Sequence, residues 1–173
     1  IAMGDWLIDV SACRAGGLHE ALQRRDFTIN ALAAPLSPAA NGEAGPTLDA
    51  PIDPLGGLAD LKARRIRHIT AEGLEEDPLR LLRAVRLAVA LEGFRLDAGL
   101  ECEIRKRAHL IASCPAERIL AEMEVILACG RAGAGLRMMD GLGLLFHLFP
   151  EMAPLNVMRF DESVFRMLGE QLI

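Results

Sequence analysis

The sequence predicts an α+β fold in which a small β-rich part precedes a larger helical part. Before about residue 70, short β-branched and apolar runs are separated by clusters of glycine, proline and asparagine, a pattern typical of strands and turns. Beyond residue 70, the apolar residues recur with a period near 3.6, which is typical of amphipathic helices. Only 4% of the 173 residues are aromatic, so the core must consist mainly of Leu, Ala, Val and Ile, a composition that favours helices.

In the first part we expect four strands and two short helices. The expected strands are residues 6–10, 27–36, 47–52 and 66–69. The second and third of these strands flank a loop rich in Pro, Gly and Ala, and should form a hairpin with a long tip. The short helices are expected at 18–24 and 58–63, the latter after a turn at 53–57.

In the second part, Asp77 followed by Pro78 predicts a helix start, with the Asp77 side chain as the cap. This helix should end before Gly93. Three further helices are expected, at residues 98–111, 116–129 and 132–141. The predicted organisation is therefore a β-rich domain at 1–70, a helical domain at 71–152, and a segment at 153–173 that is the start of a further helical body or a tail.

Composition and charge narrow the class of protein. We expect no membrane span and no secretory leader, hence a soluble, cytoplasmic protein. A net charge of -5 argues against a passive basic coat for nucleic acid, yet 17 of the 19 basic residues are arginines, which suit phosphates and base edges. The cysteines are scattered and are interpreted as buried reduced thiols: Cys13, Cys102, Cys114 and Cys129. We assign none of the four histidines to catalysis, and the oligomeric state stays open.

Three arginines form a stripe on the helix that follows Pro78. Arg80, Arg83 and Arg86 recur at intervals of three residues, opposite an apolar face. Apart from Glu76, which lies four residues before Arg80, no acidic residue at i,i+4 spacing compensates them, so they should repel one another unless an anion is bound. A polyphosphate would supply that anion, and a solvated helix surface is the alternative.

Three strings in order carry a resemblance: RRDFTINALA at 24–33, DPLGGLADL at 53–61 and EDPLRLLRAVR at 76–86. Together they resemble the class II tRNA nucleotidyltransferase and bacterial poly(A) polymerase family, over roughly residues 5–152. The resemblance implies the C-terminal part of a β-rich, polymerase-β-like nucleotidyltransferase head, followed by an all-helical neck that binds the nucleotide base and RNA. The second string resembles the connection between the two, a structural element or hinge.

The resemblance also implies an activity. In this family the 3′-terminal hydroxyl of an RNA attacks the α-phosphate of a nucleoside triphosphate and releases pyrophosphate. The reaction would add CMP and AMP from CTP and ATP to tRNA, or AMP to RNA 3′ ends as in a poly(A) polymerase. Which of these the chain serves stays open, and a non-catalytic RNA- or nucleotide-binding module that has lost its metal site is the alternative. A helical interaction domain with arginines only on its surface is a third interpretation.

The resemblance assigns roles to individual residues. Arg25, Arg83 and Arg86 would contact the triphosphate. Asp26 would sense the ribose hydroxyl, and Asn30 belongs to the same nucleotide-binding set. Asp77 and Arg80, beside Glu76, would read the base, since a carboxylate accepts and a guanidinium donates hydrogen bonds.

The metal site is a departure from the family pattern. Such enzymes hold two Mg²⁺ ions on an Asp-x-Asp pair, and these 173 residues contain no Asp-x-Asp. We therefore expect the chain to be N-terminally incomplete, with the Mg²⁺ ligands upstream of Ile1, and to be inactive alone. Asp9 is a candidate for a third carboxylate near the metals.

Overall fold

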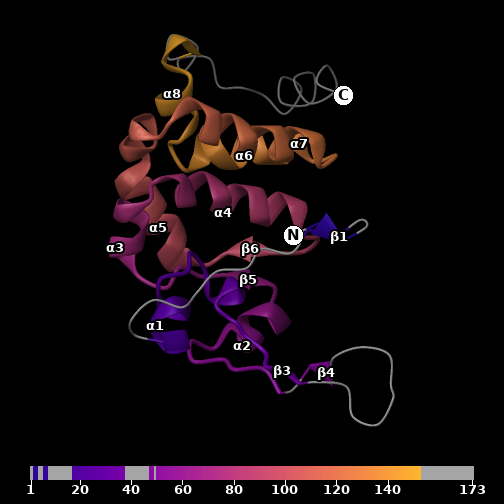
Figure 1. The fold of residues 1–173 in the computed structure, drawn as a ribbon. Coiled ribbons are helices and arrows are strands. Elements are labelled where there is room, and N and C mark those ends of the chain that lie inside the picture. Colours follow the sequence, from indigo (N-terminus) through magenta and orange to yellow (C-terminus); the bar gives the residue numbers. More distant parts are fainter. Residues whose placement is uncertain (1, 4–5, 8–16, 38–46, 49, 153–173) are drawn as a thin grey trace.

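The computed structural model describes residues 2–3, 6–7, 17–37, 47–48 and 50–152. Within these residues the chain is mostly helical and contains three pairs of short strands, which confirms the predicted α+β class. The described residues from 17 to about 70 lie at one end of the molecule and the later helices at the other (Figure 1). Asp9, Cys13 and the segment 153–173 fall outside the described residues, so the expectations for them are not addressed.

The predicted hairpin is present. Strand β3 (Leu36–Ser37) pairs antiparallel with β4 (Thr47–Leu48), and a bridge between Ala33 and Ile52 continues the pairing. A further antiparallel pair joins β1 (Ala2–Met3) to β2 (Trp6–Leu7). Strand β2 lies within the strand expected at 6–10, whereas β1 was not expected. The two short helices also match the expectation, α1 at Gly17–Gln23 and α2 at Gly57–Lys62.

The prediction of a strand over 27–36 is wrong at its start, because Thr28–Asn30 form the 3₁₀ helix η1. Local hydrogen bonds explain the difference: the Asp26 carboxylate accepts from the backbone N–H of Phe27 and from the Asn30 side chain. Such bonds between a side chain and nearby groups favour a turn over an extended strand.

Two elements between residues 70 and 97 were not expected. Helix α3 (Ala71–Glu76) begins after Thr70, whose hydroxyl accepts from the N–H of Gly73 at 3.1 Å. Strand β6 (Arg95–Leu96) pairs in parallel with β5 (Arg65–Ile66) and so joins the two parts of the chain. The division between them near residue 70 stays a prediction.

Asp77 does not cap the helix that follows it. It is the C-terminal cap residue of α3, and helix α4 (Leu79–Ala90) begins after Pro78 with no side-chain cap. The expected cap is therefore wrong, because α3 ends where a free helix start was assumed. The Asp77 side chain is instead bonded to a distant arginine, described below.

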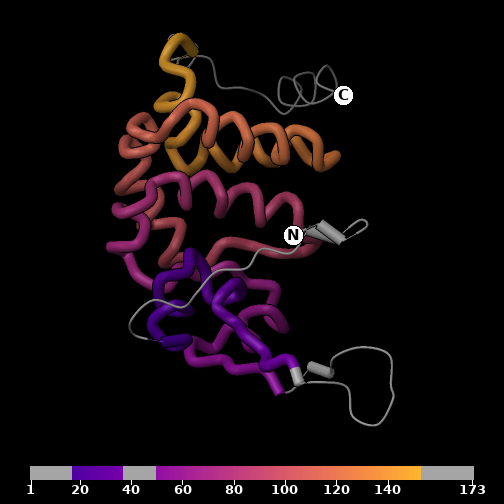
Figure 2. Tube along the Cα trace, in the orientation of Figure 1, coloured from indigo at the N-terminus to yellow at the C-terminus, as the bar shows by residue number. Residues whose placement is uncertain are grey.

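The predicted apolar face of α4 is confirmed, since all five of its residues are buried: Leu81, Leu82, Val85, Ala88 and Val89. The face packs against two later helices, α6 (Ala116–Ala128) and α7 (Ala132–Gly141). The expected helix at 98–111 is α5 (Ala98–Arg107), continued by the 3₁₀ helix η2 (Ala108–Ser113), and a short α8 (Leu145–Leu148) follows α7. In Figure 2 the tube places α4 between the α6–α7 layer and the indigo and purple first part.

Two expectations from composition can be compared with the structure. In the described part of the chain, no helix is long and apolar enough to cross a membrane. Among the described cysteines none forms a disulfide, but Cys102 is exposed and Cys114 and Cys129 are half-buried, so the expectation of buried thiols is wrong. Cys114 and Cys129 pack partly against the core, whereas Cys102 lies on the outward face of α5.

Candidate functional site

A pocket of about 520 Å³ lies between the segment after α1 and the first turns of α4. Its lining comprises Arg24, Arg25, Asp26, Asn30, Asp77, Arg80, Arg83 and Arg86. The structure thus brings together all seven nucleotide-binding residues proposed from the sequence, and adds Arg24. Five arginines and two aspartates give the lining a formal charge of +3, which favours an anionic ligand.

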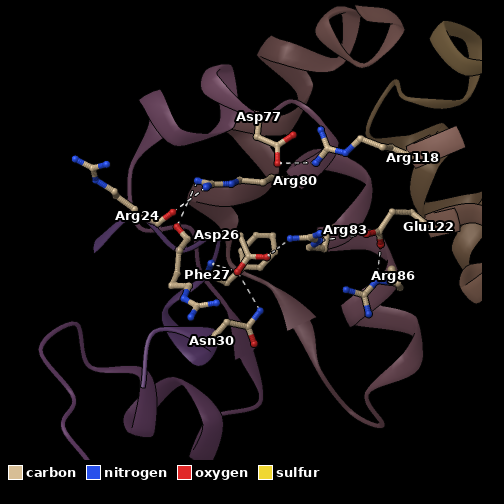
Figure 3. A network of polar contacts seen from close by, with 11 residues as sticks. Arg24, Asp26, Phe27, Asn30, Asp77, Arg80, Arg83, Arg86, Arg118 and Glu122 are labelled. Carbon is tan, nitrogen blue, oxygen red and sulfur yellow. Dashed lines mark hydrogen bonds and ion pairs between the residues drawn. The ribbon is translucent and has the colours of Figure 1, made fainter. Parts of the chain in front are cut away.

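Asp26 connects the first part of the chain to α4 (Figure 3). The residue is only 8% exposed. One carboxylate oxygen accepts from the Phe27 N–H at 2.8 Å and from Asn30 Nδ2 at 3.0 Å, and the other accepts from Arg83 Nη1 at 3.1 Å. The fixed position of Asp26 therefore depends on contacts from both sides of the pocket.

Glu122 of α6 compensates two of the three arginines in the stripe. Its Oε1 accepts from Arg83 Nε at 3.2 Å, and its Oε2 accepts from Arg86 Nε at 2.5 Å. The inference that only a bound anion could relieve the repulsion is therefore wrong for Arg83 and Arg86, because Glu122 and Asp26 come from distant parts of the sequence. Burial opposes ionisation of Arg83, but the hydrogen bonds to Asp26 and Glu122 raise its pKa above the usual value.

Asp77 and Arg80 face the same pocket without pairing to each other. Arg80 donates to the backbone carbonyls of Arg24 at 2.8 Å and Arg25 at 3.3 Å, and Asp77 accepts from Arg118 Nη2 at 3.1 Å. Glu76, which the sequence placed beside them, is exposed and is not part of the lining. The two side chains are held by different neighbours, so each can present its remaining polar atoms to a ligand.

Gly73 leaves room for the side chain of Arg80. A Cβ atom at Gly73 would lie 2.6 Å from Nη1 of Arg80, so the absence of a side chain at this position lets the guanidinium pack against α3. The path of Arg80 toward the carbonyls of residues 24 and 25 therefore depends on Gly73.

The segment 53–61 supports η1 from below the pocket. Asp60 is fully buried and accepts from Thr28 Oγ1 at 2.6 Å, from Arg65 Nη2 at 2.6 Å and from Arg67 Nε at 2.9 Å. The Asp53 carboxylate accepts from the first backbone N–H groups of α2, at Gly57 and Leu58. These contacts agree with the structural role expected for this string, and they hold the backbone on which Asp26 and Asn30 lie.

The sequence did not identify three residues around the pocket: Arg24, Arg118 and Glu122. Arg118 and Glu122 are four residues apart on α6, a spacing that usually means a surface pair with each other. Both bond instead to residues about 40 positions earlier in the chain. The available signal was this pair of opposite charges on one face of α6.

No candidate metal centre is found in the part of the chain that the structure describes. There, no group of three or more His, Cys, Asp or Glu side chains could hold a metal ion. The two carboxylates of the pocket, Asp26 and Asp77, are each engaged by an arginine.

Two sequence families match most of the chain. Residues 9–67 match the family described as the poly A polymerase head domain. Residues 93–155 match the family described as the probable RNA and SrmB-binding site of polymerase A.

Individual relatives agree with these matches. The chain is 34% identical to a CC-adding tRNA nucleotidyltransferase of Synechocystis over 82% of its own length and 32% of the relative. It is 36% identical to an A-adding tRNA nucleotidyltransferase of Deinococcus radiodurans over 78% of its length and 30% of the relative. Among solved structures, the Bacillus stearothermophilus CCA-adding enzyme in complex with CTP superimposes with a TM-score of 0.69 at 34% identity, covering 88% of this chain and 34% of that one.

The chain spans about a third of the length of the curated relatives it matches. Both family matches, the relatives and the solved structure point to one group of proteins. The chain belongs to the class II tRNA nucleotidyltransferase and bacterial poly(A) polymerase family.

Proposed function

We propose that this chain provides the nucleotide-binding pocket of an enzyme that adds CMP or AMP, from CTP or ATP, to the 3′ end of an RNA, with tRNA as the substrate. The observation that carries the proposal is the convergence of seven motif residues, from both parts of the chain, on one positively charged pocket. Relatives that are named as CC-adding and A-adding tRNA nucleotidyltransferases support tRNA, CTP and ATP as the partners.

The order of residues along α4 fits a nucleotide. At about 1.5 Å per residue, Arg83 lies about 4.5 Å and Arg86 about 9 Å beyond Arg80 along the helix axis. We assign Asp77 and Arg80 to the base and place the triphosphate toward Arg83 and Arg86. In this arrangement the base and the phosphates contact different turns of the same helix, so the two tasks can be separated by mutation.

The assignment of the base rests on complementary hydrogen bonding. A carboxylate offers only acceptors and a guanidinium offers only donors. Cytosine and adenine each present an exocyclic amino donor and a ring nitrogen acceptor on the Watson-Crick edge, so Asp77 and Arg80 can satisfy either base. Uracil and guanine present a carbonyl in place of that amino group and a ring N–H in place of the acceptor nitrogen, so in the same orientation an acceptor would face Asp77 and a donor would face Arg80.

The arginines of the pocket also suit the chemistry of the transfer. Negative charge accumulates on the phosphate oxygens as the RNA hydroxyl attacks and pyrophosphate leaves, and positioned cations stabilise that charge. Arg25 comes from the first part of the chain, whereas Arg83 and Arg86 come from α4. Donors that approach from two sides would fix the orientation of the triphosphate.

Membership of this family implies a divalent metal ion, and we propose Mg²⁺. The described side chains do not fit such a site, because the pocket carboxylates already accept from arginines. The ligands would therefore be residues outside the described part. We further propose that the helical part after residue 70 contacts the RNA and that the protein acts in the cytoplasm.

Equilibrium titration of the chain with ATP, CTP, UTP and GTP tests the proposal. ATP and CTP should bind more tightly than UTP and GTP, and Arg25→Gln should weaken both preferred nucleotides. Arg95, an exposed arginine on β6, provides the matched control, since Arg95→Gln removes the same charge away from the pocket. Equal affinity for all four nucleotides, or no binding by the folded chain, would contradict the proposed function.

A further inference from the structure

Glu122 is a charged residue that is only 9% exposed, yet the proposed function gives it no contact with substrate. A buried carboxylate is costly unless its oxygens are well satisfied. Here each oxygen accepts from a different arginine, Oε1 from Arg83 and Oε2 from Arg86 (Figure 3). Both arginines line the pocket, whereas Glu122 does not.

Both arginines contact Glu122 through the same atom, the Nε nitrogen. Glu122 accepts only from the Nε atom of each arginine, and the terminal nitrogens extend beyond that contact. Arg83 uses one terminal nitrogen, Nη1, for Asp26 on the other side of the pocket. A guanidinium held by Nε has its plane fixed, so its terminal N–H groups are pre-oriented for a ligand.

Charge provides a second reason for a carboxylate at this position. Arg83 and Arg86 are three residues apart on α4, and like charges at that spacing repel each other. One carboxylate placed between them offsets the repulsion without occupying the terminal nitrogens. Glutamine could not do the same, because it has one acceptor oxygen and its NH₂ group would face an Nε–H donor.

We propose that Glu122 is a positioning residue, which holds the guanidinium groups of Arg83 and Arg86 with their terminal nitrogens available to the triphosphate. This inference rests on the proposed function, in which these arginines contact phosphates. It predicts that loss of Glu122 changes the recognition of the β- and γ-phosphates more than that of the nucleoside.

The test compares Glu122→Gln with Glu124→Gln, a control at an exposed position of the same helix. Dissociation constants are measured for ATP, AMP and inorganic tripolyphosphate. In Glu122→Gln the affinities for ATP and tripolyphosphate should fall by roughly tenfold, as for the loss of one charge-assisted hydrogen bond, and that for AMP by less than about threefold. Glu124→Gln should match the wild type.

Two further measurements separate positioning from general loss of structure. The ¹⁵N NMR signals of the two arginine Nε–H groups should be protected from solvent exchange in the wild type and lose that protection in Glu122→Gln. In an Arg83→Gln/Arg86→Gln background, adding Glu122→Gln should leave the ratio of ATP to AMP affinity unchanged. If Glu122→Gln does not fold, Glu122→Asp keeps the charge but is too short to reach both arginines, and should lower the same ratio.

The outcomes distinguish the two proposals. If the wild type prefers ATP and CTP but the ratio of ATP to AMP affinity stays within about twofold in folded Glu122→Gln, the positioning role is overturned and the proposed function stands. If the wild type binds tripolyphosphate without preferring any base, and Glu122→Gln weakens that binding, the positioning role stands and the proposed function fails. A folded wild type that binds neither tripolyphosphate nor nucleotides overturns both.

Discussion

Replacing Asp60 by asparagine should destabilise the folded chain by about 2 to 3 kcal/mol. Asp60 is fully buried beneath η1 and accepts hydrogen bonds from Thr28, Arg65 and Arg67. Asparagine has nearly the same shape, so the change removes charge and one acceptor without opening a cavity. The loss in stability therefore measures the hydrogen-bond network alone.

The magnitude follows from how exposed the donors are. Removing one partner of a fully buried ion pair costs about 3 to 5 kcal/mol, because the other charge stays buried and unpaired. The Arg65 and Arg67 side chains are 42% and 38% exposed, so water can solvate them after the substitution. Each arginine contact is then worth about 1 kcal/mol, and the buried Thr28 hydroxyl a similar amount. Since asparagine keeps one acceptor oxygen, it retains part of the stabilisation that the three contacts provide together.

The effect should also depend on pH, with a defined sign. Burial disfavours the charged form of Asp60, but the hydrogen bonds from Thr28, Arg65 and Arg67 outweigh it and lower the pKa below its ordinary value of 3.8. Below that ordinary value the unfolded chain binds the proton more readily than the folded chain, so in this pH range the free energy of unfolding decreases as the pH is lowered. The stabilisation by Asp60 is complete above pH 3.8 and is lost as the pH falls through the folded pKa.

Urea unfolding of the wild type and of Asp60→Asn, at pH 7 and at several values below 3.8, measures both effects. The difference in unfolding free energy should be largest at pH 7 and should narrow in acid. Glu92→Gln, which removes an exposed carboxylate, serves as the control and should change stability little. A difference below about 0.5 kcal/mol at pH 7, or one that does not narrow in acid, would refute the reasoning.

Three other substitutions test different parts of the structure. Gly57→Ala should destabilise the chain by about 1 to 3 kcal/mol, because the new Cβ would lie 2.2 Å from the Thr28 carbonyl oxygen. The control Gly141→Ala should be tolerated, because no atom lies within 4 Å of its Cβ, and thermal unfolding compares the two variants. Arg25→Gln should weaken ATP and CTP to the same extent, since phosphate contacts carry no base information, and a loss confined to one nucleotide would contradict that role. Asp77→Asn should reduce discrimination between the preferred and the other nucleotides by about 1 to 3 kcal/mol in competitive titrations. The loss of stability should be small, because the Asp77 side chain does not cap α4, and unchanged selectivity would exclude Asp77 from base reading.

Periodicity was a sound guide to the elements whose stability is local. The apolar face of α4 and the hairpin of β3 and β4 follow from residue spacing and turn composition, and both are present. The start of η1 was missed because the Asp26 carboxylate bonds to its own neighbours, a preference that alternating hydrophobicity does not reveal. Strand β6 was missed because two residues are too few to show a period, and its pairing with β5 is made across 30 positions of sequence.

Some residues of the site could likewise be identified from the sequence, and others could not. The strings that carry the arginines and aspartates of the pocket are continuous in sequence, so motif matching found them together. Glu122 and Arg118 could not be found in that way, because their partners lie on α4 and at the end of α3. Their roles depend on how α6 packs against α4, and a single sequence contains no direct record of that packing.

Arg80 binds the first part of the chain through peptide carbonyls, not through side chains. Every amino acid supplies such a carbonyl, so this contact is indifferent to which residues occupy positions 24 and 25. Selection can therefore alter the side chains at those two positions to suit different ligands without detaching them from α4. The same independence means that a library randomised at 24 and 25 would sample binding properties on an unchanged backbone.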